Sequence, residues 1–423
     1  MKKKIITAIM AFVLMFTVIP NLTGCYGRSR TLVLHSWGYF IDHSTLRDFE
    51  AWFLEETGER VRVSVSYFDS NEMVSRNLGD GHSIDLVNPS DYMIQSLIRR
   101  NLLQELDAKV VNRFNEVGYD MLMNLTEVYD PTGRFSVPYI WGTYGIMYDA
   151  RKITGTNRDL LNSWGALFDT SHTMFNNQVT LKESIRDTYG AALLYLYREQ
   201  LYTASNGFTD YTLPAYRELL EDLFQNFSDS VMTGENGRYQ RVGRLLQARR
   251  GTIHSFEIDA GKSQMLAGGA QDPSLGLYWS VDAGWAMQQT NGTALGYIIP
   301  EEGTNVWVDA WVIPTTAVNT RAANYFIYFS MKPEIARRNA LFAGGQASNH
   351  QEMLALRAEF ETDEEGFFNN PTNANFREAF LEAVFPSAAT LQRAAIKGDP
   401  GVWLGRLSQM LNDVRAGAWT PNH

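Results

Sequence analysis

The chain has a single cysteine among its 423 residues, and it lacks the common catalytic signatures. One cysteine cannot form an internal disulfide, so packing must stabilise the fold. There is no Gly-x-Ser-x-Gly elbow, no His-Glu-x-x-His, no Walker loop and no Gly-x-Gly-x-x-Gly after a strand. The seven histidines are scattered singly, without the spacing of metal ligands. The sequence therefore predicts a protein that is not an enzyme and needs neither a metal nor a cofactor.

Long apolar runs are also missing, apart from one at the start of the chain. Residues 2–4 are lysines, and an apolar run over residues 5–19 follows them. This order indicates a secretory leader, because the run is too short and wrongly flanked for a normal membrane span. The sequence Leu-Thr-Gly-Cys at residues 22–25 comes next and resembles the lipobox of bacterial lipoproteins. We expect residues 1–24 to be a signal peptide and lipid on Cys25 to anchor the protein to a membrane.

The remaining composition is that of a globular protein with a surplus of acidic residues. Hydrophobic residues make up 45% of the chain and charged residues 20%, which is typical of a globular protein. At 423 residues the chain can bury one large core or two domain-sized cores, and the length favours two. The formal net charge is −10, and it becomes −13 when the three lysines of the leader are removed. This balance disfavours a nucleic-acid partner and suits cationic ligands, although many soluble proteins are acidic for solubility alone.

From residue 31 the pattern alternates strands with helices, which is typical of a mostly parallel sheet covered by helices. Strands are expected at residues 31–34, 61–67, 84–87, 136–148, 178–181, 275–279 and 306–313, and helices at residues 45–58 and 70–78. Thr45 is expected to cap the first helix and Gly58 to end it. Ligands in such sheets bind where strands end and helices begin, so Trp37 and residues 90–92 occupy site-like positions.

The stretch of residues 306–313 alternates in the manner of a strand, which places Trp307, Asp309 and Trp311 on one face. A carboxylate between two indoles suits neither a core nor a solvated surface, because burial without a partner costs several kcal/mol of hydration. An ammonium group there would meet the charge and the ring faces together, gaining roughly 0.5–2 kcal/mol per aromatic. The alternative is a half-exposed strand whose Asp309 pairs with a lysine or arginine of the same chain.

Five blocks of sequence then occur in a fixed order. They are Ser36-Trp37 with Leu46 and Glu56-Thr57-Gly58, residues 85–92, residues 136–142, residues 275–279 and Trp307-Val308-Asp309. In this order they resemble the spermidine/putrescine-binding proteins that serve ATP-driven importers. The resemblance runs, with gaps, from about residue 31 to residue 417, and it is weakest over residues 190–270 and 355–400.

The resemblance implies an α/β fold of the type II periplasmic-binding-protein kind, with two lobes joined by a hinge and a central, mostly parallel sheet flanked by helices in each lobe. After a tether at residues 25–30, lobe one would comprise residues 31–142 and 307–352, and lobe two residues 143–306 and 353–423. The implied partners are a small cationic ligand, held between the lobes, and an ABC permease in the cytoplasmic membrane. The protein would be a monomer in the periplasm or on the outer face of that membrane.

In this family, aromatic walls hold the methylenes of a polyamine and carboxylates hold its ammonium ends. The positions that match in residue type are Trp37, Ser90, Tyr92, Trp279, Trp307 and Asp309, and Asp91 lies among them. The resemblance therefore implies an intact cation clamp on lobe one.

The second lobe departs from the pattern of the family. Ser184 and Asp187 stand at its paired acidic positions, so one acid has become serine and a longer acid has shortened. Phe40 falls where a tyrosine is usual. These departures put the second ammonium anchor in doubt, and Glu183 or Asp282 could compensate for the lost acid.

Other functions stay open from the sequence. The same fold could hold a different small solute, which the serine at position 184 favours. The chain could also be a surface lipoprotein hydrolase with a dispersed triad, or a lipoprotein that keeps the two-lobe shell for adhesion. Micromolar binding needs about 8 kcal/mol. One acid, two ring faces and four methylenes only just supply this before association costs of several kcal/mol, so tight diamine binding requires a second acid.

Overall fold

The computed structural model describes residues 30–257, 260–289, 294–362 and 376–421. The predicted signal peptide (residues 1–24), Cys25 and the tether up to residue 29 lie outside the described residues. In the part of the chain that is described, no helix is both long enough and apolar enough to span a membrane.

Strands and helices alternate along the described chain, as the sequence pattern predicts. The strands are β1 (Arg30–Trp37), β2 (Val61–Phe68), β3 (Leu86–Val87), β4 (Leu103–Gln104), β5 (Ser136–Asp149), β6 (Val179–Lys182), β7 (Ile253–Glu257), β8 (Leu275–Trp279), β9 (Leu295–Ile298), β10 (Thr304–Pro314), β11 (Gln346–Ala347) and β12 (Ala394–Ala395). The longer helices are α2 (His43–Thr57), α3 (Asn71–Gly79), α4 (Asp91–Arg99), α5 (Ala108–Val117), α6 (Asp120–Tyr129), α9 (Ile185–Leu196), α11 (Pro214–Gln225), α13 (Arg238–Arg249), α14 (Ala260–Ala267), α15 (Ser280–Gln289), α16 (Thr320–Ser330), α17 (Pro333–Ala343), α18 (His350–Thr362), α19 (Phe376–Val384) and α21 (Trp403–Ala416). Short helices are α7 (Thr156–Asp159), α8 (Gly165–Phe168), α10 (Arg198–Ala204), α12 (Asp229–Met232), α20 (Ala388–Gln392) and the 3-10 turns η1 (Leu160–Asn162), η2 (Thr173–Phe175) and η3 (Arg250–Thr252).

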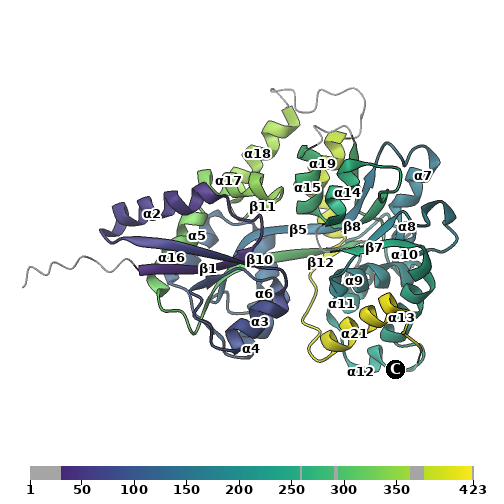
Figure 1. The fold of residues 1–423 in the computed structure, drawn as a ribbon, viewed down its shortest axis with the longest axis horizontal. Coiled ribbons are helices and arrows are strands. Elements are labelled where there is room, and N and C mark those ends of the chain that lie inside the picture. The colour runs from purple at the N-terminus through teal and green to yellow at the C-terminus, as the bar shows by residue number, and fades with distance from the viewer. Residues whose placement is uncertain (1–29, 258–259, 290–293, 363–375, 422–423) are drawn as a thin grey trace, which may run out of the picture.

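The main sheet has the strand order β2-β1-β3-β10-β5-β8-β6-β7. Its two ends are parallel, because β1 pairs in parallel with β2 and β3, and β6 does so with β7 and β8. The long strands β5 and β10 are antiparallel to each other and connect the two ends. Figure 1 shows two groups of helices and strands side by side, with β5 and β10 running between them. The predicted α/β class, a sheet flanked by helices, is what the structure has.

Strand β5 serves both halves of the sheet, and all of its residues are buried. Its first half pairs with β10, and its second half pairs with β8 and β9. At the change-over lies Gly142, where a Cβ atom would collide with the Ser280 hydroxyl and the Trp307 indole. Glycine is therefore required where the two long strands approach α15.

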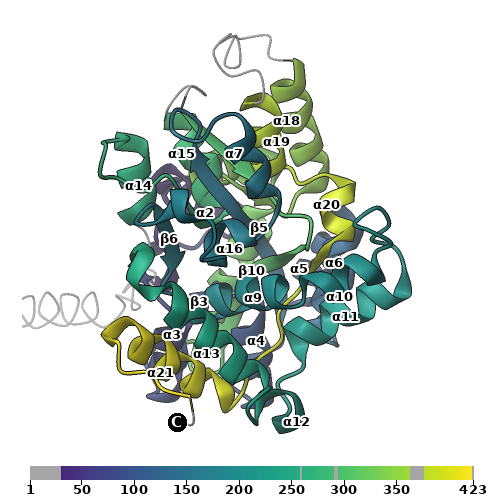
Figure 2. The same cartoon turned by 90° about the vertical axis from the view of Figure 1, so that its right-hand side faces the viewer.

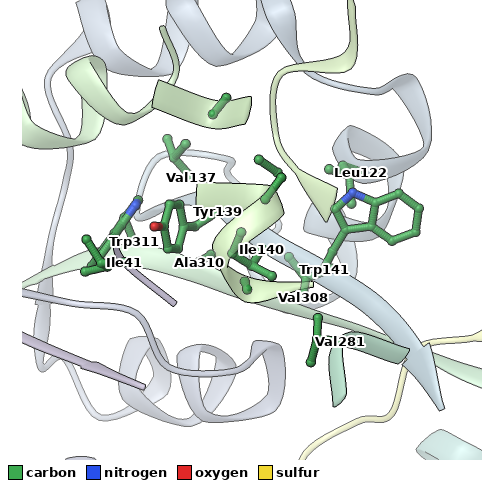
Figure 3. Packing of buried hydrophobic residues seen from close by; sticks show 14 of the residues in the cluster. Ile41, Leu122, Val137, Tyr139, Ile140, Trp141, Val281, Val308, Ala310 and Trp311 are labelled. Atoms are coloured by element: carbon green, nitrogen blue, oxygen red, sulfur yellow. The ribbon is translucent and has the colours of Figure 1, made fainter. Parts of the chain in front are cut away.

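Two hydrophobic clusters cover the sheet, one mainly around β1, β3 and β10 and the other around β6, β8, α9 and α13. In the first cluster Trp311 is fully buried, with its ring centroid 4.5 Å from that of Tyr139 and 5.5 Å from that of Phe326 in α16 (Figure 3). Trp311 is therefore a core residue and does not frame a ligand site.

For α2, the predicted C-terminal end is correct and the predicted N-cap is not. Gly58 ends α2 with a φ of 71°, as predicted. The N-cap of α2 is Asp42, whose carboxylate accepts a hydrogen bond from the Ser44 amide at 2.7 Å, and the predicted cap at Thr45 is wrong. Thr45 lies inside the helix and donates to Asn339 of α17, because both residues are buried at the contact between α2 and α17.

Candidate functional site: a cleft beside Asp309

A cavity of about 520 Å³ opens between the two groups of elements. This volume is in the range of small-molecule sites. The cavity lies where β1, β3, β6 and β8 end and where α4, α9 and α15 begin, which is where ligands of such sheets bind. All the cleft residues expected from the sequence line it: Trp37, Phe40, Ser90, Asp91, Tyr92, Ser184, Asp187, Trp279, Asp282, Trp307 and Asp309. That they bind a ligand stays a prediction.

Asp309 is only 4% exposed and faces this cavity. Its Oδ1 atom is buried without a hydrogen-bond partner, and within the described residues no salt bridge includes it. Burial raises the pKa of Asp309 well above the ordinary value. The Ser90 hydroxyl and the Trp37 indole oppose this rise, whereas the neighbouring carboxylates of Asp91 and Asp187 add to it. In the part of the chain that the structure describes, Asp309 therefore has no lysine or arginine partner and is not half-exposed, contrary to that alternative.

Ser90 holds the strand that carries Asp309. The two residues form an antiparallel bridge between the start of α4 and β10. The Asn71 side chain accepts a hydrogen bond from the Ser90 amide and donates one to its hydroxyl, both at 3.0 Å. Ser90 stands at the N-cap of α4 but makes no side-chain cap bond, and its hydroxyl stabilises the ionised form of Asp309. Asn71 carried no signal in the sequence.

Asp91 also connects the start of α4 to β10. Its carboxylate accepts from the Tyr92 amide at 2.6 Å and from the Val308 amide at 3.0 Å. Oδ2 therefore holds α4 to β10, while Oδ1 accepts from the first turn of α4, and this acid has a structural task although it borders the cavity.

Indoles form the walls of the cleft. Trp37 packs on Phe68 with ring centroids 4.4 Å apart, and its Nε1 is buried without a hydrogen-bond partner. Trp307 donates from Nε1 to the Thr143 carbonyl at 2.9 Å. Because Trp311 is in the core, Trp37 takes the place of the second indole that was expected beside Asp309.

On the opposite side, Asp187 already has a cationic partner. Its Oδ1 atom forms an ion pair with Lys397, and its Oδ2 accepts from Trp279 Nε1 at 3.0 Å. Burial alone would raise the pKa of Asp187, but Lys397 and the hydrogen bonds outweigh it and hold that pKa below the ordinary value. Asp187 lies in the first turn of α9, yet its side chain is buried and is not a solvated helix acid.

The other acids expected to compensate are occupied as well. Asp282 accepts from Lys182 Nζ at 3.0 Å and from Lys262 Nζ at 2.8 Å. Burial opposes the ionised form, but these two ammonium groups keep the pKa of Asp282 lowered. Glu183 pairs with Arg415. The chain therefore supplies its own cations to the acids of this side.

Arg186 closes over the cleft from α9. Its guanidinium carbon lies 3.4 Å from the centroid of the Tyr92 ring, and its Nη2 donates to the carbonyls of Lys397 and Gly398 at 3.3 and 3.1 Å. The Tyr92 hydroxyl donates to Glu72 at 3.0 Å. The ring face that was expected to contact a ligand is thus covered by Arg186. The described residues contain no group of three or more His, Cys, Asp or Glu side chains that could hold a metal ion.

Comparison with known proteins places this geometry in a family. Residues 82–355 match the bacterial extracellular solute-binding proteins. The chain is 24% identical over 389 residues to spermidine/putrescine-binding periplasmic protein 1 of Haemophilus influenzae, covering 91% of this chain and 89% of the relative. It is 28% identical over 334 residues to the putrescine-binding periplasmic protein SpuD of Pseudomonas aeruginosa, covering 76% and 80%.

The fold has solved counterparts. A putative spermidine/putrescine ABC transporter protein from Listeria monocytogenes superimposes with a TM-score of 0.67 at 24% identity, covering 92% of this chain and 99% of that one. The predicted type II periplasmic-binding-protein fold is thereby confirmed, and the hydrolase alternative is wrong because the matched family consists of binding proteins. The chain belongs to the bacterial extracellular solute-binding proteins.

Proposed function

We propose that the chain captures an organic cation of the amine class in the cleft and delivers it to a membrane permease. The buried Oδ1 atom of Asp309, which has no hydrogen-bond partner and faces the cavity, carries this proposal. A carboxylate in this position loses hydration, and within the described residues no cation of the chain pairs with it, whereas an ammonium group would supply both a counter-charge and a hydrogen bond to Oδ1. The names of the relatives, which bind putrescine or spermidine, support the same class.

The walls of the cleft suit such a ligand. Trp37, Trp279 and Trp307 offer apolar surface to methylene groups and ring faces to a cation. Among the described residues, seven carboxylates and three basic side chains line the cavity. Glu183, Asp187 and Asp282 are already paired with basic side chains, so the remaining excess of acid lies on the side of Asp309 and favours a positive group there. Polyamines and simpler amines both meet these requirements.

Binding would close two lobes over the ligand. We place lobe one at residues 31–142 and 307–352 and lobe two at residues 143–306 and 353–423, with the hinge in β5 and β10. A ligand that contacts both lobes favours the closed form, which the permease then recognises.

We also propose that lipid on Cys25 anchors the mature protein to a membrane. Mass spectrometry of the mature N-terminus checks this, because the N-terminal peptide would carry the mass of the lipid.

The test is a titration with amines in which binding is measured by intrinsic tryptophan fluorescence or by calorimetry. Replacing Asp309 with asparagine (Asp309→Asn) should weaken amine binding at least tenfold, because the amide has no charge to offer the ammonium group. Asp169→Asn is the matched control, since Asp169 lies outside the cleft and bonds to the amide of Ser171. Equal affinities in the wild type and Asp309→Asn would show that the acid is not the cation site.

A different small solute is the second candidate. The ion pairs of Asp187 with Lys397 and of Asp282 with two lysines favour it, because they remove the acids that would hold the far end of a polyamine. In that case putrescine and spermidine would leave the fluorescence unchanged.

A further inference from the structure

We infer that Lys397 fills the second ammonium site of the cleft, so that this protein selects ligands with a single ammonium group over diamines. The inference rests on the proposed function, because it assumes that the first ammonium site is Asp309. It names the substrate class as a primary amine whose far end is neutral or anionic.

The ion pair of Lys397 with Asp187 has the composition expected for a bound ligand. Both side chains are buried and border the cavity. The carboxylate is oriented by the Trp279 indole at 3.0 Å, as an acid prepared for a cation would be. The ammonium group that meets this acid, however, belongs to the chain itself.

Lys397 is held firmly in this place by its own segment, which runs from β12 to α21. Figure 2 shows this stretch crossing the molecule between α20 and α21. The Gly398 amide donates to the Phe224 carbonyl at 3.1 Å, and the Asp399 amide donates to Gln95 Oε1 of α4 at 3.1 Å. Arg186 donates to the Lys397 carbonyl. A backbone tied on both sides makes Lys397 a fixed part of the cleft.

A second ligand ammonium would therefore meet positive charge at the far side. Lys397 and the guanidinium of Arg186 both border the cavity there, and Asp282 is occupied by Lys182 and Lys262. Like charges brought together in a site of low dielectric repel strongly. A hydroxyl, methyl or carboxylate group at the far end avoids this repulsion.

The first experiment compares three ligands with the same four-carbon chain: butylamine, 4-aminobutyrate and putrescine. Calorimetry on the wild-type protein should show at least one of the first two binding at least tenfold more tightly than putrescine. Putrescine binding as tightly as, or more tightly than, both others would overturn the inference and leave the proposed function intact. Failure of all three to bind would overturn the proposed function itself.

The second experiment removes the internal ammonium group. Lys397→Met keeps an unbranched side chain that is one atom shorter and removes the ion-pair partner of Asp187, so putrescine affinity should rise at least tenfold, and putrescine should raise the melting temperature more than butylamine does. Lys152→Met is the control, because Lys152 binds the carbonyls of Gly269 and Asp272 away from the cleft. Selectivity should be unchanged in this control.

An unpaired Asp187 could prevent Lys397→Met from folding, so a double variant is included. Asp187→Asn with Lys397→Met removes both charges of the buried ion pair and should bind butylamine as the wild type does, without gaining putrescine affinity. An equal rise in putrescine affinity in the double variant would mean that Asp187 is not the acceptor, and the inference would then be wrong.

Discussion

Asp309 combines deep burial with an unmet hydrogen bond, and each has a consequence for binding. Burial raises the pKa of this carboxyl, so the free protein holds a proton there over part of the pH range above the ordinary value of 3.8. A cationic ligand binds the ionised form, because only that form carries the counter-charge. Binding an ammonium group therefore requires release of this proton wherever Asp309 is still protonated.

This linkage predicts a pH dependence with a definite sign. The affinity for butylamine, which stays protonated at acidic and neutral pH, should increase as pH rises above 3.8, by up to about tenfold per unit, and level off above the raised pKa of Asp309. Calorimetry at several pH values measures this. Asp309→Asn should show a flat profile, and a flat profile in the wild type would contradict the assignment.

The partners of individual acids were beyond the reach of the sequence. Asp187 was singled out because it stands at an acidic position of the family, yet its partner Lys397 lies 210 residues further along the chain. No local pattern marks such a pair, since long-range contacts depend on how the segments cross in space. Arg186 is adjacent to Asp187 in the sequence, but neither its contact with the Tyr92 ring nor its hydrogen bonds to the Lys397 and Gly398 carbonyls was predicted.

At the scale of elements, β10 shows what alternation determines and what it leaves open. The strand and the shared face of Trp307 and Asp309 follow from the period of two, whereas the position of this face in a cleft was what the resemblance to a family implied. The period says which face a side chain takes, but not what covers that face. Near Trp307 the cover is a cavity, whereas near Trp311 it is Tyr139 and α16.

The close packing of paired strands β5 and β10 against α15 provides a test at the scale of elements. Gly142→Ala should destabilise the fold by about 1–3 kcal/mol, because the added Cβ would overlap Ser280 and Trp307 in a packed site. Urea denaturation measures the change. Gly405→Ala is the matched control in α21, where a Cβ meets open space, and it should stabilise the protein by about 0.5–1 kcal/mol. If Gly142→Ala is as stable as the wild type, Ser280 and Trp307 can move to make room for the added Cβ atom.

At the scale of the molecule, contacts across the cleft hold its two sides together without a ligand. The stack of Arg186 on Tyr92 joins α9 to α4, and the ion pair of Asp399 with Arg99 ties the segment after β12 to α4. Such contacts favour closure before binding, which raises affinity by reducing the cost of the conformational change.

Removing the stack should open the free protein. Arg186→Met is expected to increase the radius of gyration in solution scattering and to weaken amine binding roughly twofold to thirtyfold, since a cation–ring contact contributes about 0.5–2 kcal/mol. Tyr92→Phe is the matched control, because it keeps the ring that Arg186 covers. If the two variants scatter alike, the stack does not hold the sides together.

The sequence by itself determined the class of fold, the strands that end at the cleft and the residues that line it. These follow from local periodicity and from blocks of sequence shared in order with a family, and both are properties of short stretches. Tertiary structure alone decided that Trp37 and not Trp311 stands beside Asp309, and that lysines form ion pairs with Asp187 and Asp282. The physical reason is that the charge state of a buried acid, and whether it has an ion-pair or hydrogen-bond partner, depend on groups from distant segments, which only the folded chain brings together.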